Sequence, residues 1–254
     1  MCGRYALDVT GPEIAAAFTD GLGAIPGLAI GSGAGWSPRW NIAPTQSAPV
    51  VRRGRGEGLV LDLLRWGLVP PWADDPAIGS RMINARGESA HEKPSYREPW
   101  RHRRCLVPIR AFYEWSTSGG RKVPHAIRAA DDGLLALAGL WTRSDRAVDA
   151  GTSEGLETFT IVTTSPNPRF AAIHDRMPVI LDGRDRETWL DHRPESEGGP
   201  SSTRLHALLR ACDEDRLRWH PVSSRVNRPA VDDPELLSVA DGDAGIGQPG
   251  LFDC

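Results

Sequence analysis

The chain of 254 residues is 40% hydrophobic and 25% charged, which is the composition of an ordinary globular protein. No apolar run reaches the roughly eighteen residues of a membrane span, and no secretory signal is visible, so we expect a cytoplasmic protein, nucleoid-associated if bacterial. The formal net charge is −3, but 17 Lys and Arg against 11 Asp and Glu give residues 1–128 a charge of +6, and the other 126 residues carry −9. One basic face on an acidic body is compatible with nucleic-acid binding, and a mixed solvated surface is the alternative.

The four cysteines, at positions 2, 105, 212 and 254, are far apart, and none belongs to a C-x-x-C pair. This spacing predicts neither a zinc site nor a disulfide framework, and it is typical of a protein from a reducing compartment. The seven histidines show no metal-ligand spacing. We therefore expect no metal and no cofactor.

The N-terminal sequence, Met1-Cys2-Gly3-Arg4-Tyr5, has a chemical property that an internal cysteine lacks. Once Met1 is removed, Cys2 carries a free α-amine and a thiol on adjacent carbons, with ordinary pKa values of about 8 and 8.5. The amine condenses with an aldehyde to an imine, and the thiol then closes a thiazolidine ring. The alternative is that Cys2 simply follows the start codon and has no special role.

The first predicted elements are a short strand at residues 4–9 and a short helix. Thr10 and Glu13 form a T-x-x-E capping box, which predicts a helix that runs through Phe18. The following residues 21–37 are rich in glycine and predict a surface loop.

The rest of the chain is rich in strand signals. Short apolar runs between turn residues predict strands at 47–53, 59–65, 105–109, 123–129, 134–141, 157–164 and 219–223. Amphipathic segments predict helices at 184–191 and 203–211. Many strands with few short helices indicate one α+β domain with a mostly antiparallel sheet and short flanking helices. We place it at residues 1–228, followed by a tail, 229–254, that is partly disordered from about residue 240.

Two residues are candidates for acid–base chemistry. Glu114 lies among aromatic residues in Phe112-Tyr113-Glu114-Trp115, which suits a general acid or base, and the alternative is a glutamate on the polar face of a strand. His174 precedes Asp175-Arg176, and an acidic neighbour can orient an imidazole. A satisfied structural histidine is the alternative there.

Other residues suggest nucleic-acid contacts. Asn84 and Arg86 are two apart, so on an extended segment they face the same way and can hold a phosphate and a reacting group. Pro44 is stiff enough to insert between bases, although turn formation explains it equally well. A further set fits a stacking platform beside an electrostatic groove for single strands, with core tryptophans near a solvated charge run as the alternative: Trp66, Trp72 and Trp100, with Arg97, Arg101, Arg103 and Arg104.

Eight motifs, spread over residues 1–228, resemble one family in content and order. They are Met1–Tyr5, Asn41–Thr45, Trp66–Pro70, Ile83–Glu88, Arg104–Pro108, Phe112–Trp115, His174–Pro178 and Trp219–Ser223. The family is SRAP, the SOS response-associated peptidases or abasic-site processing proteins. The departures lie outside these motifs, at residues 21–37, 145–156, 193–202 and in the tail.

The resemblance implies an α+β fold built on a barrel-like antiparallel sheet with a basic DNA groove. It implies that processed Cys2 captures the ring-opened aldehyde of an abasic site in single-stranded DNA as a thiazolidine, a DNA damage response. Asn84 would position the Cys2 terminus, Glu114 would be the acid–base group, and His174 would act at the sugar. We assign DNA contacts to Arg4, Asn41, Pro44, Trp72, Arg86 and Arg176.

Two other readings remain open. In an N-terminal-nucleophile peptidase, the Cys2 thiol attacks a carbonyl while the α-amine acts as base, and removal of Met1 is itself self-catalysed. In a non-catalytic single-strand binder, Cys2 has no chemical role. In each reading we expect a monomer whose partner is not a membrane.

Overall fold

The computed structural model of the chain describes residues 2–19, 28–54, 56, 58–148 and 155–240. Within these residues the strands are β1 Tyr5–Leu7, β2 Leu28–Ile30, β3 Arg39–Ile42, β4 Ser47–Arg53, β5 Leu59–Trp66, β6 Asn84–Arg86, β7 Arg104–Ile109, β8 Ala111–Ser118, β9 Arg121–Ala129, β10 Leu135–Val148, β11 Gly155–Thr164, β12 Met177–Pro178 and β13 Leu217–Pro221. The α-helices are α1 Gly11–Thr19, α2 Gly87–Ala90, α3 Arg97–His102, α4 Arg184–Leu190 and α5 Ser202–Ala207. No helix in the described ranges is long and apolar enough to cross a membrane.

The larger sheet closes on itself. Its strands follow the order β12-β11-β10-β7-β4-β5-β2, and β11 also pairs with β5, in parallel, with Phe159 opposite Trp66. The strands β11, β10, β7, β4 and β5 therefore form a closed ring, which removes free edges between them. The β2–β5 and β6–β11 pairs are also parallel, and the other ladders are antiparallel. The predicted barrel-like and mostly antiparallel sheet is thus confirmed.

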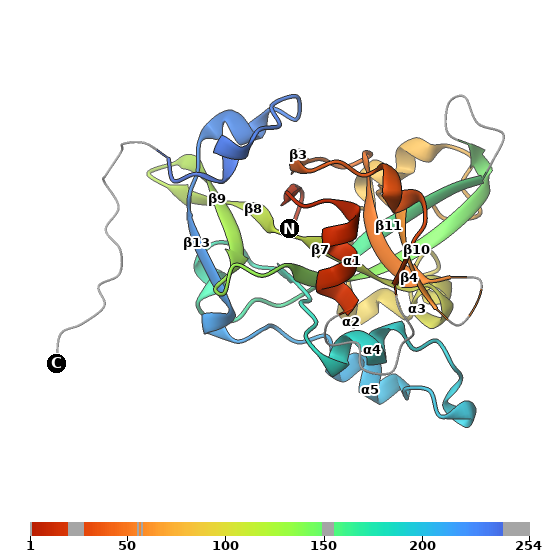
Figure 1. Cartoon of the computed structure of the whole chain (residues 1–254). Helices are drawn as coiled ribbons and strands as arrows, with labels where there is room; N and C mark the ends of the chain where they lie inside the picture. The colour runs from red at the N-terminus through yellow and green to blue at the C-terminus, as the bar shows by residue number, and fades with distance from the viewer. Residues whose placement is uncertain (1, 20–27, 55, 57, 149–154, 241–254) are drawn as a thin grey trace.

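The smaller sheet carries the N-terminal strand in its interior. Its order is β13-β9-β8-β1-β3, so β1 lies between β3 and β8, and Figure 1 shows the start of the chain between these two strands. The β8–β9 hairpin turns at Gly119 and Gly120, whose φ angles are 55° and 76°. Two consecutive residues with positive φ give the turn whose twist matches that of a hairpin, and glycine adopts it at low cost.

Local signals in the sequence set several element ends as predicted. The backbone N–H and the Oγ–H of Thr10 both donate to the Glu13 carboxylate, at 2.7 and 2.6 Å, which confirms the capping box. Ile14 and Phe18 then bury the inner face of α1. The predicted strand at 47–53 agrees with β4, whereas β10 continues seven residues beyond its predicted end at 141, and α5 ends earlier, at Ala207.

The glycine-rich segment 21–37 differs from the predicted loop. Residues 20–27 lie outside the described residues, but Leu28–Ile30 form β2 and Ser32–Gly35 form a 3-10 helix. Strand β2 pairs with β5, and the Ser32 N–H and Oγ–H donate to Asp62 of β5 at 3.1 and 3.2 Å. A ladder to a strand about thirty residues away therefore overrides the local glycine signal.

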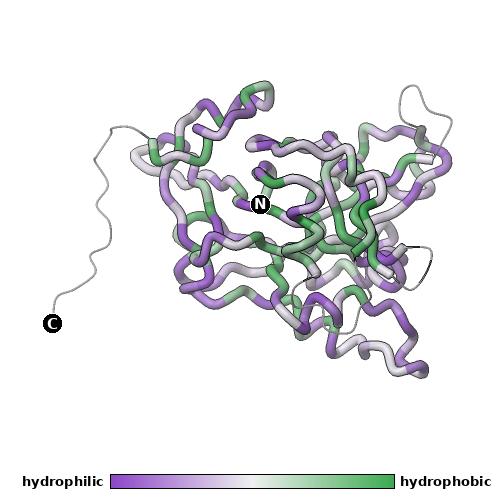
Figure 2. The backbone as a smooth tube through the Cα atoms, in the orientation of Figure 1, coloured by the Kyte–Doolittle hydropathy of each residue, from purple (hydrophilic) through white to green (hydrophobic). Residues whose placement is uncertain are grey.

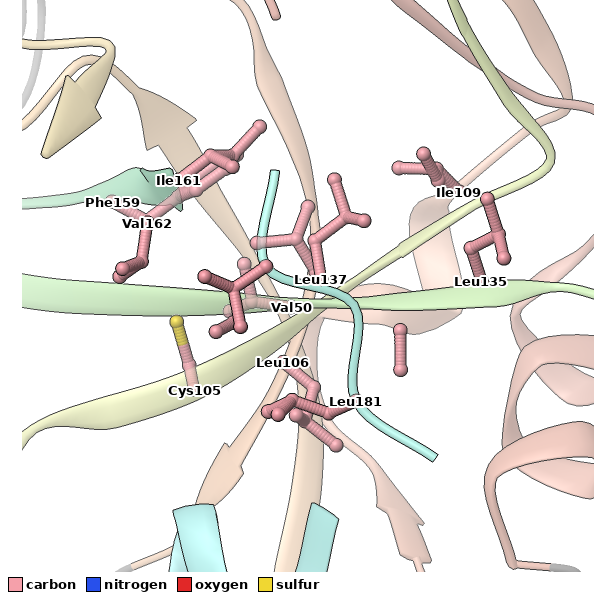
Figure 3. Packing of buried hydrophobic residues seen from close by; sticks show 14 of the residues in the cluster. Val50, Cys105, Leu106, Ile109, Leu135, Leu137, Phe159, Ile161, Val162 and Leu181 are labelled. Atoms are coloured by element: carbon pink, nitrogen blue, oxygen red, sulfur yellow. The ribbon is translucent and has the colours of Figure 1, made fainter. Parts of the chain in front are cut away.

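The main hydrophobic core fills the barrel and the space beneath its helices. Figure 2 shows the hydrophobic segments concentrated in the central strands, with hydrophilic residues on the outer turns. In Figure 3 Val50, Leu137 and Ile161, from β4, β10 and β11, lie on one side of the strands, and Leu106 of β7 lies on the other side, beside Leu181. Each of the first four is fully buried, so both sides of these strands are packed.

Arg104, at the start of β7, joins two helix ends to the barrel. Its side chain is 2% exposed and donates to the carbonyls of Trp100, Arg101, Trp189 and Asp191. These carbonyls belong to the C-terminal ends of α3 and α4, where backbone acceptors lack partners and the helix dipole favours a cation. Burial lowers the pKa of the Arg104 guanidinium to about 10. The side chain is therefore a structural connector.

The segment 224–240, which we call the C-terminal strap, packs on the smaller sheet. Leu236 is fully buried, Val231 packs beside it, and the Ala240 N–H donates to the Pro221 carbonyl at 3.0 Å. The domain boundary placed at residue 228 thus falls inside a packed segment, because these apolar side chains cover Tyr113 and its neighbours. The tail from residue 241 lies outside the described residues.

Candidate active site

Cys2 lies inside the protein, held by Asn84. The Cys2 side chain is fully buried, and the Asn84 Nδ2 donates to the Cys2 carbonyl at 2.9 Å. Asn84 is placed by β6, which pairs with β11 through Ile161. Asn84 and Arg86 lie on a short extended strand, with Ala85 buried between them. Cys2, which lies next to the N-terminus, is therefore held by a residue that comes 82 positions later in the chain.

The Cys2 thiol is kept in its neutral form. Burial, followed by the negative charge of Glu114, raises the pKa of this thiol well above its ordinary value. The contribution of Glu114 to the raised pKa indicates that its carboxylate lies near the thiol. A thiol in this state becomes a strong nucleophile only when a base takes its proton, and the Glu114 carboxylate is a base whose charge acts on it.

Glu114 reaches Cys2 because β8 runs antiparallel to β1. Tyr5 lies opposite Phe112, and the Tyr113 N–H donates to the Arg4 carbonyl at 2.9 Å. Continuing this register places Glu114 opposite Gly3, next to Cys2. The Glu114 side chain is only 2% exposed. The flanking Tyr113 and Trp115 pack in the cluster under the C-terminal strap, because successive side chains of a strand point to opposite faces.

His174 enters from the turn between β11 and β12. The 3-10 helix Phe170–Ala172 packs its Phe170 ring on Phe112, with centroids 5.9 Å apart, and the His174 N–H donates to the Phe170 carbonyl at 3.2 Å. Strand β12 then pairs with the end of β11 at Thr163, beside Arg86. His174 therefore lies between elements that carry Glu114 and Arg86.

The contacts of the His174 ring define which nitrogen carries a proton. The Arg176 backbone N–H is 3.0 Å from Nδ1, and an Asp175 carboxylate oxygen is 2.7 Å from the same nitrogen. A neutral ring accepts from Arg176 at Nδ1, and a protonated ring donates from Nδ1 to Asp175. In both arrangements Nε2 carries a proton, as a general acid needs.

Arg4 and Asn41 form one hydrogen-bonded unit with the C-terminal strap. The Arg4 Nη1 donates to the Asn41 Oδ1 and to the Val226 carbonyl, both at 2.9 Å. The Asn41 Nδ2 lies within hydrogen-bond distance of the Val226, Arg228 and Val231 carbonyls. The Asn41 side chain has no exposed surface, so the structure does not support a direct Asn41 contact to DNA. The Arg4 Nε has no hydrogen-bond partner in the described part of the chain.

The other two predicted DNA-contacting arginines differ in their freedom. Arg86 is exposed at the end of β6. Arg176 makes a two-point ion pair with Glu88, at 2.7 and 2.8 Å, and also donates to the Thr163 carbonyl. The Arg176 hydrogen bonds lower the pKa of Glu88. A phosphate at Arg176 has to compete with this carboxylate, whereas Arg86 is accessible.

Pro44 and Trp72 lie on surface turns. Thr45, next to Pro44, has a φ of 71°, which is uncommon for a residue with a branched side chain, and its N–H donates to the Trp66 carbonyl at 2.8 Å. The turn is therefore held in a strained shape that presents Pro44. Trp72 is 53% exposed, an unusual amount for a large aromatic ring.

His125 and Asp232 lie near the predicted site residues but belong to none of the sequence motifs. His125 lies opposite Glu114 in the β8–β9 ladder, and its Nε2 is 2.9 Å from the Ser116 Oγ. The Gly119-Gly120 turn was the signal that fixes this register. Asp232 of the strap accepts from the Trp40 and Asn41 N–H groups and from Arg39. No local pattern marks Asp232, since its partners lie more than 190 residues earlier.

Comparison with known proteins gives matches over most of the chain. The family described as SOS response associated peptidase (SRAP) matches residues 1–229. The chain is 40% identical over 205 residues to the abasic site processing protein YoqW of Bacillus subtilis (strain 168), covering 80% of this chain and 86% of that protein. It is 30% identical over 243 residues to the abasic site processing protein YedK of Escherichia coli (strain K12), covering 93% and 99%. An X-ray crystal structure of a protein from Bacteroides thetaiotaomicron, 24% identical, has a TM-score of 0.76 over 94% of this chain and 100% of that chain, which shows a common fold.

Proposed function

The chain belongs to the SOS response associated peptidase (SRAP) family, and from this premise we propose that it processes abasic sites in single-stranded DNA by bonding to them covalently through Cys2. The observation that supports this most is the placement of Cys2. Asn84 donates a hydrogen bond to its carbonyl, and the negative charge of Glu114 contributes to the raised pKa of its thiol. A residue beside the N-terminus is rarely fixed so firmly in a core, and a 1,2-aminothiol chemistry requires such fixing.

The first chemical step opens the sugar. An abasic deoxyribose is mostly a closed hemiacetal, so its aldehyde has to be released. The Nε2–H of His174 protonates the ring oxygen while the hydroxyl on C1 passes its proton to water, which gives the aldehyde and a free C4 hydroxyl, and Nε2 then regains a proton from water. The Asp175 carboxylate lies 2.7 Å from the other ring nitrogen, Nδ1, so it can hold the orientation of the ring.

The second step joins the amine to the aldehyde. With Met1 gone, the Cys2 α-amine adds to C1, and Glu114 takes a proton from nitrogen and returns it to the hydroxyl that leaves as water. The Asn84 Oδ1 is buried and has no hydrogen-bond partner in the described chain, so it can accept from the freed amine and aim its lone pair. The product is an imine between Cys2 and the sugar.

The third step closes the ring. The thiol sulfur bonds to the imine carbon, and its proton passes, through Glu114, to the imine nitrogen. The result is a thiazolidine and one released water for the whole reaction. The raised pKa of the buried thiol keeps this nucleophile protonated until Glu114 accepts the proton. The same proton transfers at Glu114, in the reverse direction, allow slow release of the DNA from Cys2.

We propose the same residues for the removal of Met1. The Cys2 thiol attacks the Met1 carbonyl, the peptide nitrogen leaves with the proton that Glu114 took from sulfur, and water then hydrolyses the thioester. In this proposal the protein is a self-processing peptidase that removes its own Met1 before it reacts with DNA. A general peptidase acting on other proteins is the rival, and it leaves no bond to DNA.

DNA is held, in this proposal, by the exposed groups around Cys2. Arg86 offers an accessible guanidinium for a phosphate, and Pro44 and Trp72 present stiff or flat surfaces to bases. Arg4 is only partly buried beside the strap, but its Nη1 is held by Asn41 and Val226 and its Nε is buried, so a phosphate contact there requires the side chain to move. We expect a monomer, and the free buried thiol of Cys105 fits a reducing cytoplasm.

Intact mass spectrometry tests this function directly. Incubation with a single-stranded abasic oligonucleotide should give one new species, equal in mass to the protein without Met1 plus the oligonucleotide less one water. The matched control is the same oligonucleotide carrying a tetrahydrofuran analogue, which has no aldehyde. Absence of the adduct with the natural site, in protein shown to lack Met1, would refute the proposal.

The role of His174 is tested by changing the substrate. We expect His174→Gln to slow adduct formation on a natural abasic site by about 10²–10⁴, the usual contribution of one acid–base group. On an oligonucleotide that carries an open-chain aldehyde, the variant should react nearly as fast as the native protein. Single-turnover rates on the two substrates give the comparison. Equal impairment on both would mean that His174 positions DNA and does not open the ring.

A further inference from the structure

The arginine-rich helix α3 is not used by the chemistry described above. Its residues Arg97 and Arg101 are four apart, so they lie on one face of the helix, and both are exposed. Within the described ranges neither has a carboxylate partner. Arg103, which follows the helix, lies over the Trp141 ring, with its guanidinium carbon 5.2 Å from the centroid, and is 3.7 Å from Glu98.

Three hollows meet along this helix. The first, of about 510 Å³, is lined by Trp72, Arg97 and Arg103 among others. The second, of about 560 Å³, shares Arg103 with the first and has Trp141 in its wall. The third, of about 380 Å³, shares His192 with the second and contains Arg101. Because neighbouring hollows share lining residues, they form one continuous surface, which we call the α3 groove.

The lining of the α3 groove is cationic. Eight arginines and four carboxylates line the three hollows together. Two of these carboxylates, Asp62 and Glu157, are both bound by Arg52, at 2.8 and 2.7 Å, so they neutralise that one arginine. Arg103, Arg146 and Arg193 pair with Glu98, Asp74 and Asp191, and Arg104 is buried against backbone carbonyls. The exposed Arg97 and Arg101 therefore carry the positive charge of the groove.

The central hollow also offers a neutral hydrogen-bond donor. The Arg104 N–H donates to the His192 Nε2 at 3.0 Å, so the neutral ring carries its proton on Nδ1. Burial and the charge of Arg104 lower the pKa of His192 to about 3, so this ring stays neutral. The Trp141 Nε1–H is buried and has no hydrogen-bond partner in the described residues. The His192 Nδ1–H is therefore the neutral donor that this hollow offers to the acceptor oxygens of a ligand, because the buried Trp141 N–H is out of reach of one.

We propose that the α3 groove binds the phosphates of the DNA strand that extends from the lesion past Trp72. A groove fits a strand better than a small anion, because its charges are spread over three joined hollows and an exposed tryptophan lies at one end. The proposal rests on the proposed function, since it takes single-stranded DNA as the ligand. It adds that long substrates bind through a second surface, which the Cys2 chemistry does not need.

The test compares DNA lengths in a double variant and a matched control. The groove variant is Arg97→Gln with Arg101→Gln, and the control is Arg184→Gln with Arg210→Gln, which removes two charges around α4 and α5, outside the residues that line the groove. The probes are labelled strands with the tetrahydrofuran analogue: one of about 7 nucleotides, and two of about 25 nucleotides extended on the 5′ or on the 3′ side, since single-strand sites span about 4–16 nucleotides per module. Fluorescence anisotropy over a salt series gives affinity and its salt dependence.

We expect the groove variant to bind the short strand like the native protein and to bind one of the two long strands several-fold more weakly. Loss of two phosphate contacts should reduce the slope of log affinity against log salt by about 1.4, at about 0.7 per contact. Native-like affinity of the groove variant for both long strands, or an equal loss of affinity in the control variant, would contradict DNA binding in the α3 groove. Adduct yield on the short natural abasic strand is measured in parallel: its absence in native protein would refute the proposed function and leave the groove result standing.

Discussion

We expect the Cys2→Ser variant to bind abasic single-stranded DNA with near-native affinity and to form no heat-stable adduct. Serine keeps a small polar side chain at the buried position, but its hydroxyl gives at most an imine or a less stable oxazolidine. The loss of the adduct should therefore be complete on denaturing gels after heating, while anisotropy with the tetrahydrofuran analogue changes little. This separation of binding from bonding is the largest effect that the proposed chemistry predicts.

The design of this experiment has to allow for Met1. If Cys2 removes Met1 itself, the serine variant keeps it, so both proteins are made behind a cleavable tag that leaves residue 2 at the N-terminus. Cys212→Ser is the matched control, because Cys212 is a free and partly exposed thiol that the chemistry does not use. A heat-stable adduct in Cys2→Ser would show that another nucleophile bonds to the DNA.

Glu114→Gln should slow adduct formation by about 10²–10⁴, the usual contribution of one acid–base group. Glutamine keeps the shape of the side chain but cannot carry the proton from the amine to the leaving hydroxyl, nor accept it from the thiol. Reversal of a formed adduct should slow as well, since it uses the same group. Single-turnover kinetics in both directions measure this.

The same substitution makes a second prediction with the opposite sign. The negative charge of Glu114 contributes to the raised pKa of the Cys2 thiol, so its removal should lower that pKa. The pH dependence of thiol alkylation should shift to lower pH in Glu114→Gln, although adduct formation is slower. Glu92→Gln, at an exposed glutamate, is the control and should change neither quantity. Native-like rates in Glu114→Gln would remove Glu114 from the proton transfers.

Much of the molecule was predictable from the sequence, because the signals concerned act within a few residues. The Thr10–Glu13 capping box predicted the start of α1, and the apolar run in the segment 47–53 predicted β4. The motifs around Cys2, Asn84 and Glu114 identified the family by resemblance, and the same motifs supplied the candidate site residues. These features depend on side chains that are neighbours in the chain, so composition and spacing carry them.

The tertiary structure alone decided other features, because they depend on contacts between distant segments. Ring closure required β11 to pair with β5, and the ladder to β5 also made a strand of Leu28–Ile30 in a segment that looks like a loop. Asn41 changed from an expected DNA contact to a buried anchor because the C-terminal strap, more than 180 residues later, brings carbonyls to its amide. The Cys2 thiol acquired a raised pKa only through burial next to a carboxylate from another strand. Burial and long-range pairing are set by how the whole chain folds, and a local pattern does not contain them.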